Sequence, residues 1–284
     1  MRWTPGGRSE NLEDMRGASG GFGGSGMRIG LGGLLVLGVL SAIFGVDLIT
    51  PFTGGGSPAP SQSRNRALND PQEEKMVQFV SFVLDDAQRT WGDVLPRFGS
   101  NYRDAKLVLF RDGIRSGCGI AGSATGPFYC PGDEKVYLDL SFFEELDRRF
   151  GAPGDFAQAY VITHEIGHHV QNLLGIERRF RQSQRMNPGS ANSLSVRMEL
   201  QADCFAGVWG HSTGQRQILE QGDVEEGLRA AAAIGDDRLQ RMGQGYVNPD
   251  SFTHGTSQQR VHWFRRGLET GDVRVCDTFN PDQP

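Results

Sequence analysis

The residues best suited to chemistry lie in the segment His164-Glu165-Ile166-Gly167-His168, an HExxH motif. Positions i and i+4 of a helix face the same side, so His164 and His168 could bind one Zn²⁺, each through a nitrogen at about 2.0–2.1 Å. Glu165 could take a proton from a water at the metal and pass it to a leaving amine. The short pattern can arise by chance on a partly exposed helix. Here its apolar flanks predict a buried helix, where these polar side chains need a partner such as a metal.

A catalytic zinc site needs a third protein ligand, and Glu199 is the best candidate. It lies 31 residues after His168, in the segment RMELQAD on the next predicted helix. Asp203 follows one turn later on the same face, where it could accept a hydrogen bond from a ligand imidazole. Two acidic residues at this spacing usually lie on a solvated helix face. Here the apolar residues that follow Asp203 predict that the helix is buried. This ligand set suits one Zn²⁺ per chain, although nitrogen and oxygen ligands also bind other divalent metals.

The elements that position these residues predict an α+β fold, rich in helices and with a small sheet. The KLVLF and KVYLD segments are β-prone and short. Capping patterns begin helices at Asp70 and Thr256, and Gly175 would end the motif helix. We expect strands over 106–110 and 135–139, and helices over about 70–90, 155–174, 194–209, 224–242 and 257–267. An extended substrate could pair along the 135–139 strand if it lies at an edge, although core packing is the simpler role for Tyr137.

All four cysteines lie after a long uncharged run, which is described below. An even number of cysteines is typical of two disulfides in an oxidising compartment. Cys118 and Cys130 close a short glycine-rich loop and would pair, which leaves Cys204 to pair with Cys276. The alternative is buried free thiols. No CxxC pair is present, so a cysteine-based zinc knuckle is not supported.

The N-terminal part predicts a membrane anchor. Residues 1–28 are rich in glycine and predict a disordered tail, and residues 29–47 contain 18 consecutive uncharged residues, about 27 Å of helix. Arginines precede this run and none follows until Arg64, so the tail should stay in the cytoplasm and the rest should be exported. Residues 48–66 would form a flexible stalk and 67–284 the metallopeptidase domain. A cleaved signal peptide and a buried core helix are the alternatives.

Composition excludes several other classes of protein. The chain has 284 residues, a net charge of −5 and 37% hydrophobic residues. It therefore has no basic surplus for nucleic acid. A mean hydropathy of −0.41 excludes several membrane spans. The oligomeric state is not predicted.

Four segments together resemble the neutral zinc metallopeptidases of bacteria: GPFYCPGDEKVYLDLSFF, AYVITHEIGHHVQNLLG, RMELQADCFAGVW and FTHGTSQQRVHWF. The similarity extends over about residues 65–280, and the HEIGHH and ELQAD segments also resemble the wider gluzincins, such as thermolysin. The resemblance implies a zincin-like fold, a single membrane pass, zinc ligands His164, His168 and Glu199, and Glu165 as general base. It also suggests that His254 donates to the oxyanion, as a downstream histidine does in related gluzincins. The alternative for His254 is a capping-region residue without chemistry.

These observations predict a zinc metallopeptidase that is anchored in the cell's inner membrane and faces the periplasm or the exterior. An endopeptidase is preferred to an aminopeptidase, because no segment resembles a dedicated amine-binding motif. Its partners would be a peptide or protein substrate and the membrane. A non-catalytic, zinc-stabilised binding module is a second hypothesis, although a structural site would not need Glu165. A zinc hydrolase of cell-wall peptides is a third. A cysteine hydrolase is disfavoured because the four cysteines are expected to form disulfides.

Overall fold

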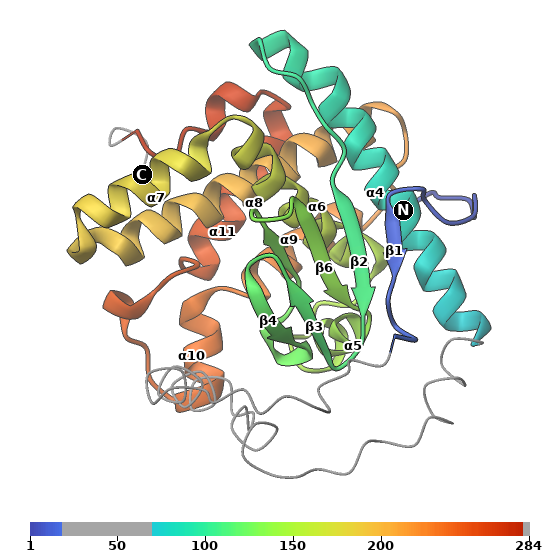
Figure 1. The fold of residues 1–284 in the computed structure, drawn as a ribbon, viewed down its shortest axis with the longest axis horizontal. Helices are drawn as coiled ribbons and strands as arrows, with labels where there is room; N and C mark the ends of the chain where they lie inside the picture. The colour runs from blue at the N-terminus through green and yellow to red at the C-terminus, as the bar shows by residue number, and fades with distance from the viewer. Residues whose placement is uncertain (19–69, 281–284) are drawn as a thin grey trace.

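The computed structural model describes residues 1–18 and 70–280, which form a mixed sheet surrounded by helices (Figure 1). The sheet has the strand order β1-β2-β6-β5. Strands β1, β2 and β6 are parallel, and β5 is antiparallel to β6. A separate two-stranded ribbon is formed by β3 and β4. The strands are β1 (Leu12–Asp14), β2 (Lys106–Phe110), β3 (Gly113–Ser116), β4 (Gly119–Gly122), β5 (Phe128–Cys130) and β6 (Lys135–Asp139).

The helices of the described residues make up most of the molecule. They are α4 (Pro71–Val94), α5 (Ser141–Arg148), α6 (Asp155–Leu173), α7 (Ile176–Met186), α8 (Ala191–Gln215), α9 (Asp223–Ala233), α10 (Asp236–Gln244) and α11 (Ser257–Thr270). The helix-rich α+β prediction is therefore confirmed. Strands β2 and β6 and helix α6 have the predicted bounds to within one residue, and Gly175 follows α6 with a left-handed φ of 69°.

One predicted helix is wrong. The segment 224–242 forms two helices, α9 and α10, which are separated at Gly235. A Cβ atom at Gly235 would lie 2.3 Å from the backbone nitrogen of Ser257, so only glycine allows the chain to pass the start of α11 here. Sequence periodicity does not reveal such a tertiary contact. Helices α5 and α7 and the short strands β1, β3, β4 and β5 were not predicted.

The sheet is buried on both faces, and alternate residues of its central strands reach different clusters. Leu107 and Leu109 of β2 belong to the main core, which includes α4, α6 and α8. Val108 and Phe110 face the opposite way, into a smaller cluster that includes Tyr137. This alternation follows from the two-residue period of a strand. Helix α6 contacts β5, β6, α4, α8 and α9, which explains the apolar residues on most of its faces.

The N-terminal residues form part of this domain. Strand β1 pairs with β2, and Trp3 packs edge-on against Phe79 of α4 with ring centroids 5.2 Å apart. Buried Arg16 bonds Asp14 at 2.8 Å. The prediction of a disordered tail over residues 1–28 is therefore wrong for residues 1–18. It also conflicts with placing the tail in the cytoplasm and the domain outside, because the two are packed together. A composition rich in glycine and arginine does not reveal pairing with a strand about a hundred residues away.

An acidic cluster lies at the other end of this segment. Asp155, Asp223 and Glu226 bring their carboxylates within 4.8 Å of one another. The amino group of Met1 donates to Asp155 at 2.7 Å and to Asp223 at 3.2 Å. One amino group of the chain thus already lies among these three carboxylates.

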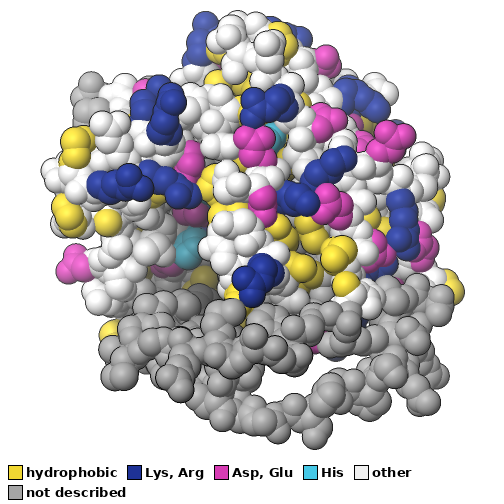
Figure 2. Space-filling view, in the orientation of Figure 1, with side chains coloured by type: hydrophobic (Ala, Val, Ile, Leu, Met, Phe, Trp, Pro, Cys, Tyr) yellow, Lys and Arg dark blue, Asp and Glu magenta, His cyan; other side chains and the backbone are white. Residues whose placement is uncertain are grey.

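The predicted anchor and stalk, residues 29–47 and 48–66, lie outside the described residues. Among the helices formed by residues 1–18 and 70–280, none combines the length and apolar character needed to span a membrane. On the surface, acidic and basic side chains are interspersed, and Lys and Arg side chains gather over α7 (Figure 2).

Both expected disulfides are present. Cys118 pairs with Cys130, and Cys204 of α8 pairs with Cys276 near the C-terminus. The first ties the turn between β3 and β4 to the end of β5. The second ties the chain after α11 back to α8, beside Asp203.

Candidate active site

The structure brings the three predicted ligands together at the crossing of α6 and α8. The ligand atoms of His164, His168 and Glu199 all lie within 4.8 Å of one another. Nε2 of His164 is 3.1 Å from one Glu199 oxygen, and Nε2 of His168 is 3.5 Å from the other. Ligand atoms on a tetrahedral zinc ion lie about 3.3 Å apart, so this donor set fits Zn²⁺ with one position open.

The glycine of the motif allows this approach. A Cβ atom at Gly167 would lie 3.0 Å from the carbonyl oxygen of Ala202, which shows how tightly α6 and α8 pack. Glu165, the neighbour of His164, is 7% exposed. Within the described residues its carboxylate has no hydrogen bond or ion pair, and its charge acts on His168. It is thus free to accept a proton from a water beside the ligands.

His164 is held by a buried charged network. Its Nδ1 lies 2.9 Å from Asp203, which is fully buried. Asp203 also accepts bonds from Arg260 at 2.8 and 2.9 Å and from the hydroxyl of Tyr160. Because a carboxylate only accepts, the His164 Nδ1 donates and its Nε2 lone pair is left for a metal. Asp203 therefore lies where the sequence predicted.

His168 is held by neutral amides instead. Its Nδ1 lies 2.8 Å from Oε1 of Gln171, whose own amide nitrogen donates to the carbonyl of Met198 at 2.8 Å. That second bond fixes the amide orientation, so the His168 Nδ1 must donate. Gln201 extends this chain by donating to the carbonyl of Cys276 at 2.8 Å. Both imidazoles thus turn Nε2 toward Glu199: without a metal Nε2 donates to the carboxylate, and a metal would take the place of that proton.

The electrostatics of the cluster favour a cation. Burial raises the pKa of Glu199, but His168 and His164 outweigh burial and hold it well below its usual range. Burial lowers the pKa of His164, but Asp203 and Glu199 outweigh it and raise the pKa to about 10. A proton and a divalent metal compete for the same nitrogens, so the charges that favour protonation also favour Zn²⁺.

The buried network depends on a close crossing of α8 and α11. A Cβ atom at Gly267 would lie 2.0 Å from the carbonyl oxygen of Cys204, and one at Gly207 would lie 2.1 Å from that of Phe264. Glycine at both positions brings the helix backbones into contact. Arg260, two turns before Gly267, thereby reaches Asp203.

His254 lies in the loop before α11 and is half exposed. Its Nδ1 is 3.1 Å from Asp236, the first residue of α10. Asp236 also accepts bonds from the backbone nitrogens of Thr253, His254 and Gly255 at 2.7, 2.6 and 3.0 Å. Burial lowers the pKa of His254, but Asp236 and Glu199 raise it by more. A Cβ atom at the neighbouring Gly255 would lie 3.3 Å from the side chain of Leu200, the residue after Glu199, so this loop packs on α8.

Sequence reasoning missed three residues that organise the site. Gln171 lies three residues after His168, on the same helix face, and this spacing could have identified it. Asp236 follows Gly235 in IGDD, a pattern typical of a helix start. The third is Tyr160. Like Arg260, it could not be given its role from the sequence, because the bonds of both to Asp203 depend on how three helices pack.

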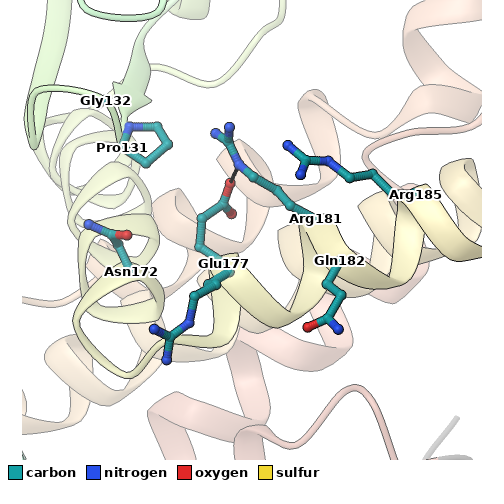
Figure 3. A pocket seen from close by; sticks show the side chains of 8 residues that line it. Pro131, Gly132, Asn172, Glu177, Arg181, Gln182 and Arg185 are labelled. Carbon is teal, nitrogen blue, oxygen red and sulfur yellow. Dashed lines mark hydrogen bonds and ion pairs between the residues drawn. The ribbon is translucent and has the colours of Figure 1, made fainter.

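A groove lies between the end of α6, helix α7 and the loop after β5 (Figure 3). Its volume is about 480 Å³. Asn172, one turn after His168, lies at its inner end. The lining residues are Pro131, Gly132, Asn172, Glu177, Arg178, Arg181, Gln182 and Arg185.

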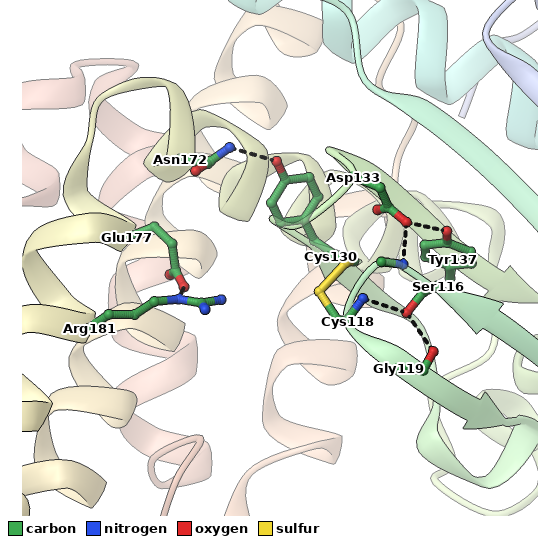
Figure 4. Close-up of a disulfide and its surroundings, with 11 residues drawn as sticks. Ser116, Cys118, Gly119, Cys130, Asp133, Tyr137, Asn172, Glu177 and Arg181 are labelled. Atoms are coloured by element: carbon green, nitrogen blue, oxygen red, sulfur yellow. Dashed lines mark hydrogen bonds and ion pairs between the residues drawn. A yellow bond between two sulfur atoms is a disulfide. The ribbon is translucent and has the colours of Figure 1, made fainter.

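Strand β5 forms an edge of the sheet next to this groove (Figure 4). Tyr129 of β5 accepts a bond from Asn172 at 3.1 Å and lies 3.0 Å from Nδ1 of His169. Nε2 of His169 donates to the carbonyl of Arg103 at 2.7 Å, so this histidine holds β5 against α6. The idea that the 135–139 strand is an edge is wrong, since β6 lies between β2 and β5. Tyr137 stacks on Phe128 in the core, as the simpler interpretation predicted.

The sheet, the motif helix and the ligand cluster define a zinc peptidase architecture, and sequence comparison agrees. The chain belongs to the family described as "Putative neutral zinc metallopeptidase", which matches residues 1–279. It is 52% identical over 286 residues to Escherichia coli "Uncharacterized protein YpfJ", covering 98% of this chain and 99% of that protein. It is 45% identical over 201 residues to Mycobacterium bovis "Uncharacterized protein Mb2605", covering 67% of this chain and 66% of that protein. No solved structure is matched.

Proposed function

We propose that the protein is a zinc-dependent endopeptidase that hydrolyses peptide bonds outside the cytoplasm. The observation that carries the proposal is the joint geometry of His164, His168 and Glu199, with both imidazoles turned so that Nε2 faces the carboxylate. Family membership implies zinc, and the donor set fits one ion per chain.

A bound Zn²⁺ would supply Lewis acidity, polarising the scissile carbonyl and lowering the pKa of a water beside it. Glu165 accepts a proton from the attacking water and returns it to the leaving amine. His254 donates a hydrogen bond to the oxygen of the tetrahedral intermediate, and Asp236 orients its ring. Asp203 and Gln171 keep His164 and His168 in the ligating tautomer.

The location is part of the proposal. Two disulfides support an oxidising compartment for the domain, that is, the periplasm or the cell exterior. Residues 1–18 would lie there too, because they pack on the domain. The uncharged run within residues 29–47 supports attachment to the inner membrane.

The test compares zinc content and cleavage in purified full-length protein and in Glu165→Gln. We expect near one zinc per chain in both, and a loss of peptide cleavage of about 10²-fold or more in the variant, since general base catalysis contributes roughly 10²–10⁴-fold. His168→Ala should lose the zinc itself. Cleavage that survives Glu165→Gln, or a folded wild-type protein that binds no divalent metal, would exclude this mechanism.

His254→Ala separates the roles of the site residues. If His254 donates to the oxyanion, kcat should fall by about 10²–10³-fold while zinc content stays unchanged. An unchanged kcat would show that His254 only caps the loop before α11.

A further inference from the structure

We infer that the groove beside helix α7 is a subsite that binds an acidic side chain, Asp or Glu, of the peptide substrate. This inference rests on the proposed peptidase function and names the substrate feature that the site selects.

The position of the groove is the first argument. Asn172 lies four residues after His168 on α6, so the two side chains share a helix face about 6 Å apart. The opposite wall is the Pro131-Gly132 turn at the end of edge strand β5. An extended peptide that pairs with β5 at the ligand cluster would therefore direct side chains into the groove.

The shape of the groove is supported on both sides. The Cys118–Cys130 disulfide fixes the chain immediately before Pro131 (Figure 4). Asn172 bonds Tyr129 of β5, which joins the inner end of the groove to the sheet. The two sides of the groove that face α7 are thus held by covalent and hydrogen bonds, and the volume of about 480 Å³ suits one or two side chains.

The charge of the groove is the third argument. Three arginines line it, and only Arg181 is offset, by Glu177 at 2.6 Å (Figure 3). Arg178 and Arg185 are exposed, and neither has an ion pair among the described residues. The lining therefore carries a net charge of +2, three arginines less one glutamate, in a chain whose net charge is −5.

Other acids near the groove do not cancel this charge. Glu134 approaches Asn172 at 3.4 Å, but Arg103 binds it at 2.8 Å. Asp133 is turned away from the groove, and bonds the Gly117 nitrogen and the Tyr137 hydroxyl at 2.6 and 2.7 Å. A guanidinium matches a carboxylate in geometry as well as in charge, so an acidic side chain is the favoured occupant.

The test measures selectivity rather than activity. Matched peptides differ only in carrying Glu, Gln or Lys at each position around the cleaved bond, and kcat/KM is compared for wild type and the double variant Arg178→Gln/Arg185→Gln. Wild type should prefer Glu over Gln at one position by roughly tenfold, and the double variant should lose that preference. The control is Arg179→Gln, because Arg179 is exposed on the same helix but lines no part of the groove. Raising the salt concentration should also reduce the preference.

A binding measurement distinguishes failure of this inference from failure of the proposed function. A fluorescent peptide with Glu at the preferred position, or at every position if nothing is cleaved, is titrated into Glu165→Gln and into Glu165→Gln/Arg178→Gln/Arg185→Gln. If the peptide binds Glu165→Gln more tightly than the triple variant but wild type does not cleave it, the subsite is supported and the peptidase function is excluded. Cleavage with equal kcat/KM for Glu, Gln and Lys would exclude the subsite and leave the peptidase standing. If the protein neither cleaves nor binds, both are wrong.

Discussion

Replacing Asp203 by Asn should separate the two tasks of the buried network, orienting a zinc ligand and neutralising Arg260. The substitution keeps the size of the side chain but removes its charge. Arg260 is 2% exposed and makes bonds of 2.8 and 2.9 Å to this carboxylate. An amide in its place can accept only through one oxygen and would turn its own donors toward the guanidinium.

Two magnitudes follow. Removing one partner of a buried ion pair costs about 3–5 kcal/mol, so the metal-free protein should unfold at markedly lower urea. The bond from His164 to an amide is weaker than to a carboxylate. Loss of such a partner typically reduces metal affinity by about 10–100-fold, that is, by roughly 1.4–2.7 kcal/mol.

The assay has two parts. Urea unfolding in the presence of a chelator measures the free energy of the metal-free fold, and competition with a zinc-binding dye measures affinity. Asp203→Asn/Arg260→Met should recover much of the lost stability, because no unpaired charge stays buried, but should not recover zinc affinity. Exposed Asp250→Asn is the matched control and should change stability by no more than about 0.5 kcal/mol.

Either of two results would refute this reasoning. A zinc affinity of Asp203→Asn within twofold of wild type would show that Asp203 does not control His164. A double variant that is no more stable than Asp203→Asn would show that the unpaired Arg260 charge is not the cause of the loss.

Three further predictions concern the fold. Gly267→Ala should lower the free energy of unfolding by about 1–3 kcal/mol, measured by urea titration, because its Cβ would lie 2.0 Å from a backbone oxygen of α8. Gly189→Ala, which meets no atom within 4 Å, is the control. The pKa of Asp236 is lowered from 3.8 by its bonds, so its stabilising effect is present above that pH and is lost as pH falls through the lower folded value. Asp236→Asn should therefore lose less stability than wild type as the pH falls below 3.8, measured by urea unfolding at a series of acid pH values. Met15→Cys and Tyr246→Cys, both at exposed positions, should react alike with a membrane-impermeant maleimide on intact cells; labelling of only one would contradict the packing of β1.

The sequence predicted those site residues whose positions depend only on the periodicity of a single helix. The i, i+4 spacing of His164 and His168 and the acidic residues on a later apolar helix required only helical periodicity, so the ligand cluster could be predicted. Asp203 followed for the same reason. Arg260 and Tyr160 could not be placed, because their contacts depend on the α8–α11 crossing, and that crossing depends on glycines whose role is visible only once the helices are packed.

The parallel pairing of β1 with β2 limits how this chain can be threaded through a lipid bilayer. A polypeptide that crosses a bilayer an odd number of times leaves its two flanks in different compartments, and strands in different compartments cannot share a ladder of hydrogen bonds. The described residues before position 19 and after position 69 do share one. In this conformation residues 1–18 and 70–280 therefore lie on the same side of any bilayer to which the chain is attached. A single crossing would require β2 to be left without β1 as its neighbour, exposing an edge of the sheet that the structure shows covered.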